Sequence, residues 1–317
     1  MKIFRQLAKA VIPQGIRSAI RHEQQRRRWT CEHRAGGPGL EVIIRTNSGL
    51  GDVMIARQLK RAFDDALRGG RRVPGVRRMV ITGGMWGTMF RLPEADLQVY
   101  WWWSMGRSPQ WLDEYLSEVS HRPDLILSLS RSCSEELEQR ALPHLFLPLA
   151  TGSAFTPPDA GAQRSGVGYA GSRGHKDAEQ EAIVVRPFMD RPDFYWVDNL
   201  KTPEELAGFY RQRELVLGMT ERLQESRGML NNRVFEVLAT DTPFILSRHR
   251  YISEFFGLDY PYQTASAQET LALQERITQQ APGEARELAR HLGDLVRREH
   301  TWSRRIAALL DHLEDKA

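Results

Sequence analysis

The sequence predicts an α/β protein of two domains, each built around a mostly parallel sheet. Three observations predict this class. Short apolar segments typical of buried strands alternate along the chain with segments of helical periodicity. Glycine-containing turns follow two of the predicted strands, residues 41–45 and 166–170. The 317 residues also exceed what one hydrophobic core usually serves.

Composition argues against several other classes of protein. Hydrophobic residues make up 41% and charged residues 26% of the chain, as in ordinary globular proteins. No apolar run approaches the roughly 18 residues that a membrane-spanning helix needs. The only cysteines are Cys31 and Cys133, without a CxxC pair or a Cys/His cluster, so neither a disulfide framework nor a structural zinc site is expected. The apolar stretch at the N-terminus contains charges and no cleavage-type sequence, which favours a cytoplasmic protein over a secreted one.

Residues 1–36 are predicted to form a basic arm. They hold nine lysines and arginines against two glutamates, a net charge of +7, whereas the whole chain carries +4. The remainder is therefore acidic by three charges, which predicts that no nucleic acid is bound. Residues 1–28 combine apolar positions at helical spacing with cationic ones, a pattern that suits an anionic membrane surface, here the inner face of the membrane. A helix docked on the protein's own surface has the same pattern, and both interpretations stay open.

The first domain begins with a strand, a turn and a helix. The strand at 41–45 leads into a glycine-containing turn and then into a helical stripe over 53–68. Such a unit points backbone N–H groups and a helix N-terminus at a ligand. The turn residues that are candidates for acceptor or phosphate binding are Asn47, Ser48, Gly49 and Gly51. Asp52 either caps the helix or places a carboxylate at the rim of a cleft, where it can accept a proton from a hydroxyl.

The rest of the first domain alternates strands and helices. The predicted strands are 78–82, 97–101 and 125–129, and the predicted helices lie near 109–119 and 133–141. The run Trp101-Trp102-Trp103 favours packing in and around the core over a stacking platform for sugars or bases.

The second domain repeats the pattern of a strand followed by a glycine turn. After the strand at 166–170, the candidate phosphate-binding residues are Gly171, Ser172, Arg173 and Lys176. Backbone donors beside cationic side chains suit a diphosphate. The further strands are predicted at 194–197, 215–220 and 244–247, and helices near 203–212 and 251–256. Between them, Arg233 and Glu236 flank a buried helical stripe that ends near residue 239.

Residues 231–247, with Glu254-Phe255-Phe256 after them, resemble the nucleotide-sugar-binding segment of group-1 glycosyltransferases. The resemblance is greatest to the spore-maturation-type branch and extends over roughly residues 143–310, including the terminal stretch 300–305. It implies a GT-B fold, in which two Rossmann-like domains face each other across a cleft and a C-terminal helix crosses back to the first domain. The expected divisions are an arm at 1–36, an acceptor-side domain at 37–152, a donor-side domain at 153–297 and the helix at 298–317.

The same resemblance implies roles for individual residues. In that family the glutamate matching Glu236 binds the ribose hydroxyls of the donor nucleotide. Arg173 and Lys176 would hold the diphosphate and stabilise the leaving group. The full set of donor-binding residues expected is Gly171, Ser172, Arg173, Lys176, Thr220, Asn232, Arg233 and Glu236. One departure is Thr240-Asp241, where the family usually has a glycine that caps the helix and approaches the ligand.

The stretch 47–53 resembles the N-terminal loop of heptosyltransferase-type GT-B enzymes, whose aspartate serves as the catalytic base. Carried onto Asp52, this implies deprotonation of the acceptor hydroxyl and an inverting displacement. A DxD motif is lacking, so no metal is expected, and the nucleotide diphosphate sugar is a co-substrate with no further cofactor.

These observations predict a glycosyltransferase that moves a sugar from a nucleotide diphosphate sugar to a saccharide, lipid-linked or protein acceptor in cell-envelope glycan synthesis. Two alternatives stay open. One is a GT-B nucleotide-sugar epimerase or hydrolase, and the other is a catalytically inactive GT-B protein that acts as a scaffold.

Overall fold

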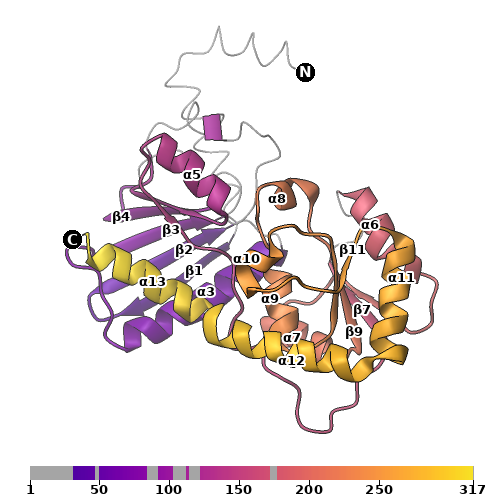
Figure 1. The fold of residues 1–317 in the computed structure, drawn as a ribbon. Helices are drawn as coiled ribbons and strands as arrows, with labels where there is room; N and C mark the ends of the chain where they lie inside the picture. The colour runs from indigo at the N-terminus through magenta and orange to yellow at the C-terminus, as the bar shows by residue number, and fades with distance from the viewer. Residues whose placement is uncertain are drawn as a thin grey trace.

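A computed structural model shows two α/β lobes side by side (Figure 1). The described residues are 31–46, 50–83, 92–102, 112–113, 122–171 and 177–316. We call the part that carries the first sheet the N-lobe and the part that carries the second sheet the C-lobe. The predicted class, two domains on mostly parallel sheets, is confirmed. In the described part of the chain, no helix combines the length and apolar character that crossing a membrane requires.

The N-lobe is a six-stranded sheet in the order β1-β2-β3-β4-β5-β6. Its strands are β1 (Cys31–Gly37), β2 (Leu40–Thr46), β3 (Arg78–Gly83), β4 (Leu97–Trp101), β5 (Leu125–Ser128) and β6 (His144–Phe146), and its described helices include α3 (Leu50–Arg68) and α5 (Arg131–Gln139). Among the described strands, β1 runs antiparallel to its neighbour, and β2 to β6 are parallel. The carboxyl ends of β2 to β6 therefore face one edge, the usual position of ligands in such sheets.

Strand β1 corrects the expectation that residues 1–36 form one basic arm. Residues 31–36 pair with β2 at the edge of the sheet. Their charged side chains lie on the solvent side, where Arg34 forms ion pairs with Glu32 (2.7 Å) and with Glu41 of β2 (2.9 Å). Because an edge strand can expose most of one face, its sequence lacks the apolar run that marks the central strands.

The C-lobe is a five-stranded parallel sheet in the order β11-β10-β9-β7-β8. Its strands are β7 (Val167–Ala170), β8 (Phe194–Val197), β9 (Leu215–Gly218), β10 (Phe244–Ser247) and β11 (Gln263–Thr264). Its helices are α6 (Ala178–Val184), α7 (Pro203–Arg211), α8 (Arg222–Ser226), α9 (Asn232–Ala239), α10 (Ile252–Phe256), α11 (Ala267–Glu275) and α12 (Pro282–Glu299), with a 3-10 turn at Arg186–Phe188 and a π turn at Arg276–Gln280. The chain passes to opposite sides of β7 when it forms β8 and then β9, so the ends of β7 and β9 enclose a topological switch point.

The last helix, α13 (Trp302–Glu314), returns to the N-lobe and packs on α3 (Figure 1). Arg71, beyond the end of α3, forms ion pairs with Asp311 (2.6 Å) and Glu314 (3.1 Å). The two chain crossings between the lobes also bond to each other, because Thr151 N donates to the His300 carbonyl (3.0 Å) and Trp302 N donates to the Thr151 carbonyl (2.9 Å). The predicted crossing of the C-terminal helix is confirmed.

Trp101 and Trp102 lie in the core. Both are fully buried, and Trp101 meets Trp302 of α13 edge to face, with ring centroids 5.7 Å apart. Core packing, rather than a stacking platform, is therefore the role of these two residues. Trp103 lies outside the described residues.

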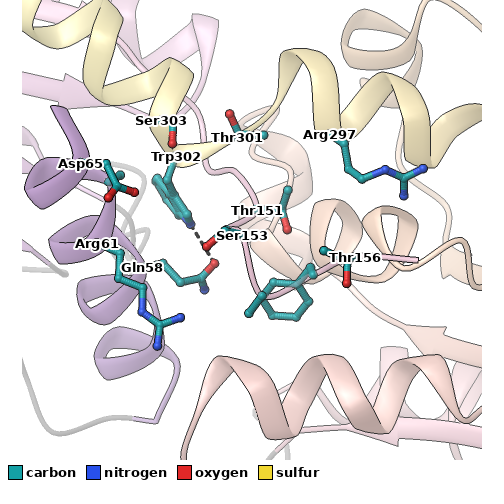
Figure 2. Close-up of a pocket in the computed structure, with 14 residues that line it drawn as sticks. Gln58, Arg61, Asp65, Thr151, Ser153, Thr156, Arg297, Thr301, Trp302 and Ser303 are labelled. Atoms are coloured by element: carbon teal, nitrogen blue, oxygen red, sulfur yellow. Dashed lines mark hydrogen bonds between the residues drawn. The ribbon is translucent and has the colours of Figure 1, made fainter. Parts of the chain in front are cut away.

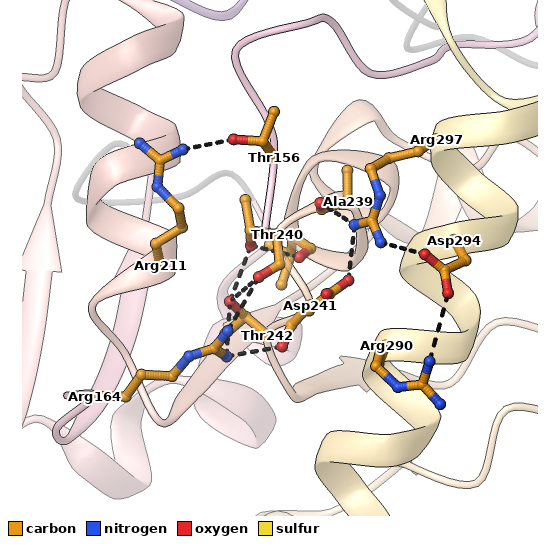
Figure 3. Close-up of polar contacts among 11 residues, drawn as sticks. Thr156, Arg164, Arg211, Ala239, Thr240, Asp241, Thr242, Arg290, Asp294 and Arg297 are labelled. Atoms are coloured by element: carbon orange, nitrogen blue, oxygen red, sulfur yellow. Dashed lines mark hydrogen bonds and ion pairs between the residues drawn. The ribbon is translucent and has the colours of Figure 1, made fainter. Parts of the chain in front are cut away.

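Asp241 follows the C-terminal end of α9 and has a φ of +50°, in the left-handed region that glycine occupies most easily. Its carboxylate accepts a hydrogen bond from Arg297 of α12 (2.7 Å), and its carbonyl accepts one from Arg164 (2.8 Å; Figure 3). The position thus ends the helix, as expected. The Asp241 side chain faces α12, at the opposite end of α9 from Asn232.

We predict that Gly293→Ala destabilises the protein by about 1–3 kcal/mol. Helix α12 passes so close to α9 at this point that a Cβ on Gly293 would lie 2.6 Å from the Leu238 carbonyl oxygen and 2.1 Å from Asp241 Oδ1. Gly283, in the same helix, has nothing within 4 Å of such an atom. Urea unfolding should therefore show a lower free energy of unfolding for Gly293→Ala. Gly283→Ala should show no such decrease, because alanine adds up to about 1 kcal/mol of helix propensity there. Equal effects of both substitutions would contradict this packing.

Candidate functional site

Glu236 is a carboxylate buried where the two lobes meet. It lies on α9 and is 1% exposed. Its Oε1 accepts a hydrogen bond from Asn232 Nδ2, one turn earlier on α9 (3.0 Å), and another from Gln58 Nε2 on α3 of the N-lobe (3.0 Å). The carboxylate thus contacts the other lobe rather than bulk solvent.

Burial governs the charge of this group. Loss of solvent raises the pKa of Glu236 above its usual value, while the hydrogen bonds from Gln58 and Asn232, and then the charge of Arg233, act in the opposite direction. No lysine or arginine in the described part of the chain forms an ion pair with the carboxylate, and its Oε2 receives no hydrogen bond from those residues. A carboxylate oxygen without a donor is well suited to accept from a ligand hydroxyl.

Several more polar groups gather at the carboxyl edge of the C-lobe sheet. Thr220, after β9, is buried, and its N–H donates to Ser247 Oγ at the end of β10 (3.0 Å). Asn231 Nδ2 donates to Thr220 Oγ1 (3.2 Å). Two buried polar atoms at this edge, Asn231 Oδ1 and His249 Nδ1, have no hydrogen-bond partner within the described residues. Unpaired buried polar atoms are rare in native proteins, so these two are candidates to bond a ligand at this edge.

The predicted diphosphate loop is described only at its start. Gly171 directly follows β7, where its N–H donates to the Val197 carbonyl (2.9 Å) and its carbonyl accepts from the Trp196 indole (2.8 Å). Ser172, Arg173 and Lys176 lie outside the described residues, so their roles stay predictions. Arg233, one turn from Glu236, is half-buried with its guanidinium carbon 4.9 Å from the centre of the Tyr169 ring. This stacking places a cation beside the end of β7.

The N-lobe candidates lie at the start of α3. Asp52 stands in the first turn of this helix and is half-buried, and Gly51 before it is exposed. Asn47, Ser48 and Gly49 lie outside the described residues. Gln58, which contacts Glu236, follows Asp52 by six residues, roughly 9 Å along the helix axis. Asp52 thus shares α3 with Gln58, the N-lobe residue that contacts Glu236.

Two pockets lie at the junction of the lobes. One, of about 320 Å³, lies between α3, the crossing at 151–156 and the start of α13, and is lined by Gln58 and Trp302 (Figure 2). The other, of about 310 Å³, is lined by residues of both lobes, among them Gly228, His300 and Arg305. Among the described residues, no cluster of three or more His, Cys, Asp or Glu side chains is arranged to hold a metal ion.

Arg305 and His300 form a coupled pair in the second pocket. The Arg305 guanidinium donates to the Pro148 carbonyl (3.0 Å) and to His300 Nδ1 (3.0 Å). Because arginine can only donate, His300 carries its proton on Nε2, which donates to the Phe255 carbonyl (3.1 Å). Burial, and then the Arg305 charge, lower the pKa of His300 from 6.5 to about 4.

Sequence reasoning missed Gln58 and Arg305 as members of this region. The sequence places Arg305 only within the terminal stretch that resembles the family. Gln58 carries a weak signal, since it is a polar residue on the apolar stripe of its helix, between the buried Ile55 and Leu59. Nothing local identifies its partners, which lie 178 and 244 residues away in the chain.

Known proteins resemble the chain in sequence and in fold. Residues 181–311 match the model of a family described as glycosyl transferase-like. The chain is similar in structure to sucrose-phosphate synthase from Thermosynechococcus elongatus, over 83% of this chain and 80% of that one, with a TM-score of 0.50 and 15% identity. The chain has the GT-B fold.

Two further GT-B structures are less similar. T4 phage β-glucosyltransferase aligns over 76% of this chain and 80% of its own, with a TM-score of 0.47 and 9% identity. The pneumococcal O-GlcNAc transferase GtfA aligns over 75% of this chain and 56% of its own, with a TM-score of 0.44 and 13% identity. No curated protein sequence matches the chain. The matched segment of this GT-B chain includes all of α9 with Glu236, and together with the fold it supports a glycosyltransferase.

We predict that the stability of the protein falls between about pH 6.5 and pH 4 through His300. The unfolded chain binds a proton to this imidazole at higher pH than the folded chain does, so acid favours unfolding. Because part of the ring is exposed, the free energy of unfolding falls by about 2 kcal/mol, which is less than the whole pKa difference would give. Urea unfolding at pH 7 and pH 4 should show a smaller acid loss for His300→Gln than for the unmodified chain. His249 is present in both proteins, so an equal acid loss in the two would refute the role of His300.

Proposed function

We propose that the protein is a glycosyltransferase that moves a sugar from a nucleotide diphosphate sugar to a saccharide, lipid-linked or protein acceptor, in the synthesis of a cell-envelope glycan. The observation that carries the proposal is Glu236: a carboxylate buried near the N-terminal turn of a helix at the lobe interface, within the glycosyl transferase-like segment. In this proposal the carboxylate binds the vicinal ribose hydroxyls of the donor.

The chemistry of the reaction requires groups from both lobes. The acceptor hydroxyl attacks the anomeric carbon of the donor sugar while the bond from that carbon to the diphosphate oxygen breaks. Asp52 accepts the hydroxyl proton in an inverting displacement. Arg173 and Lys176, with backbone N–H groups of the loop after β7, neutralise the charge that develops on the departing diphosphate. The first turn of α3 and the ends of β7 and β9 would supply these groups from opposite sides of the interface.

The buried position of Glu236 gives the proposal a sharp test in Glu236→Gln. The amide that replaces the carboxylate keeps one acceptor oxygen for both Gln58 and Asn232, so the fold should be as stable as before or more so. Removing the negative charge should weaken nucleotide binding about 10- to 100-fold, since hydrogen bonds to charged groups contribute roughly 1.5–3 kcal/mol.

Isothermal titration with UDP, GDP, ADP, CDP and dTDP measures this loss. Glu287→Gln, on the exposed face of α12, is the matched control and should bind like the unmodified chain. The proposal fails if none of the five diphosphates binds, or if Glu236→Gln binds as tightly as its control. Product analysis with and without acceptor then separates transfer from epimerisation and hydrolysis, which release product at full rate when acceptor is absent.

The basic arm supports a second part of the proposal, that the enzyme binds the inner face of a membrane through residues 1–28. Deleting these residues, which lie outside the described part of the chain, should reduce sedimentation with vesicles of mixed phosphatidylcholine and phosphatidylserine. Each basic residue near such a surface contributes about 1 kcal/mol. The chain should not sediment with vesicles of phosphatidylcholine alone. If deletion leaves sedimentation unchanged, the arm is a surface helix of the protein itself.

A further inference from the structure

We propose that Gln58 is a positioning residue, which acts across the lobe interface to aim the carboxylate of Glu236 at the donor's ribose. The proposal rests on the proposed function, because it assigns a role to a residue that touches Glu236 rather than the ligand. It begins from the burial of Gln58, which is 3% exposed on α3 between apolar neighbours. An amide in such surroundings is costly unless its polar atoms are bonded.

Trp302 determines which way the Gln58 amide faces. The indole Nε1–H can only donate, and it donates to Gln58 Oε1 (3.1 Å; Figure 2). The Gln58 NH₂ group is thereby directed to Glu236 Oε1 (3.0 Å). The flipped amide would set its NH₂ against the indole N–H and its oxygen against the carboxylate, so both contacts would become repulsive. One orientation is therefore strongly favoured.

The consequence at Glu236 is an asymmetric carboxylate. Gln58 and Asn232 both donate to Oε1, while Oε2 receives no hydrogen bond from the described residues. Asn232 alone, a neighbour on the same helix, would leave the carboxylate free to rotate about its last torsion. The second donor, which comes from the other lobe, fixes this rotation and reserves Oε2 for a ligand hydroxyl.

The surroundings of Gln58 support a role in holding geometry. The crossing between the lobes passes directly over the amide, since a Cβ on Gly152 would lie 2.5 Å from Gln58 Oε1. Three helices, α3, α9 and α13, meet at this amide. The orientation of the Glu236 carboxylate therefore depends on how the two lobes and α13 pack together.

Two substitutions at position 58 distinguish a role in orienting the Glu236 carboxylate from a role in packing alone. Gln58→Met keeps the length of the side chain but cannot donate, and it should weaken binding of the five nucleoside diphosphates about tenfold. Gln58→Glu sets a second carboxylate against Glu236 and should weaken binding more at pH 8. Near pH 5 the two carboxylates share a proton, so the new carboxyl group can donate to Glu236 while it still accepts from Trp302. Binding by Gln58→Glu should therefore recover at least tenfold between pH 8 and pH 5, relative to the unmodified chain.

A third variant tests the orientation of the amide. Trp302→Phe keeps an aromatic ring against Trp101 but removes the indole donor, so the Gln58 amide can flip. We expect a several-fold loss of nucleotide affinity in a folded protein, as judged by thermal unfolding of each variant. Recovery of Gln58→Glu at low pH is the readout that a merely structural role would not produce.

The possible failures are distinguishable. Loss of binding in Glu236→Gln, with unchanged binding in folded Gln58→Met, overturns the positioning role and leaves the proposed function standing. A loss in Gln58→Glu that does not depend on pH also overturns it. Unchanged binding in Glu236→Gln, or no binding of any diphosphate by the unmodified chain, overturns both proposals.

Discussion

The structure depends on a carboxylate that is buried between two lobes and hydrogen-bonded by amides rather than paired with a cation. An ion pair at Glu236 would hold the charge more strongly but would also occupy the oxygens that a ligand needs. Two amides on a single oxygen relieve part of the cost of burial and leave the other oxygen without a donor. The raised pKa of Glu236 shows that the relief is incomplete. A desolvation cost that the protein's own hydrogen bonds do not fully offset is typical of sites where a ligand supplies the remaining hydrogen bond.

This arrangement requires that the lobes be held in a defined relation. The chain crosses between them twice, and the crossings bond to each other through the backbone of Thr151, His300 and Trp302. Side chains add contacts on both sides: Arg61 of α3 pairs with Glu204 of α7, and Ser132 Oγ donates to the Arg227 carbonyl (2.7 Å). Because α13 belongs to the C-terminal segment but packs on the N-lobe, it holds Trp302 against Gln58 of α3.

The sequence was sufficient for the parts of this structure that depend on local pattern. Apolar runs such as 78–82 and 244–247 predicted central strands, because a strand covered on both faces has no polar positions to obscure it. The same reasoning missed β1, whose charged residues lie on an exposed edge. Gln58 was beyond prediction for a different reason. The role of Gln58 depends on partners that only the tertiary fold brings close to it. A polar residue on an apolar helix face is compatible with many such partners.

The replacement of the family's usual glycine by Asp241 bears on whether the chain is an inactive scaffold. A non-glycine residue in the left-handed region is strained, and strain of this kind persists only where neighbouring contacts compensate for it. Here the compensation is visible, since Arg297 donates to the Asp241 carboxylate and Arg164 to its carbonyl, while a glycine at position 293 leaves room for the side chain. These contacts hold the end of α9 remote from Asn232. Asp241 therefore ends the helix through contacts with Arg297 and Arg164, and none of its contacts within the described residues reaches Glu236. Its presence gives no support to the loss of a site.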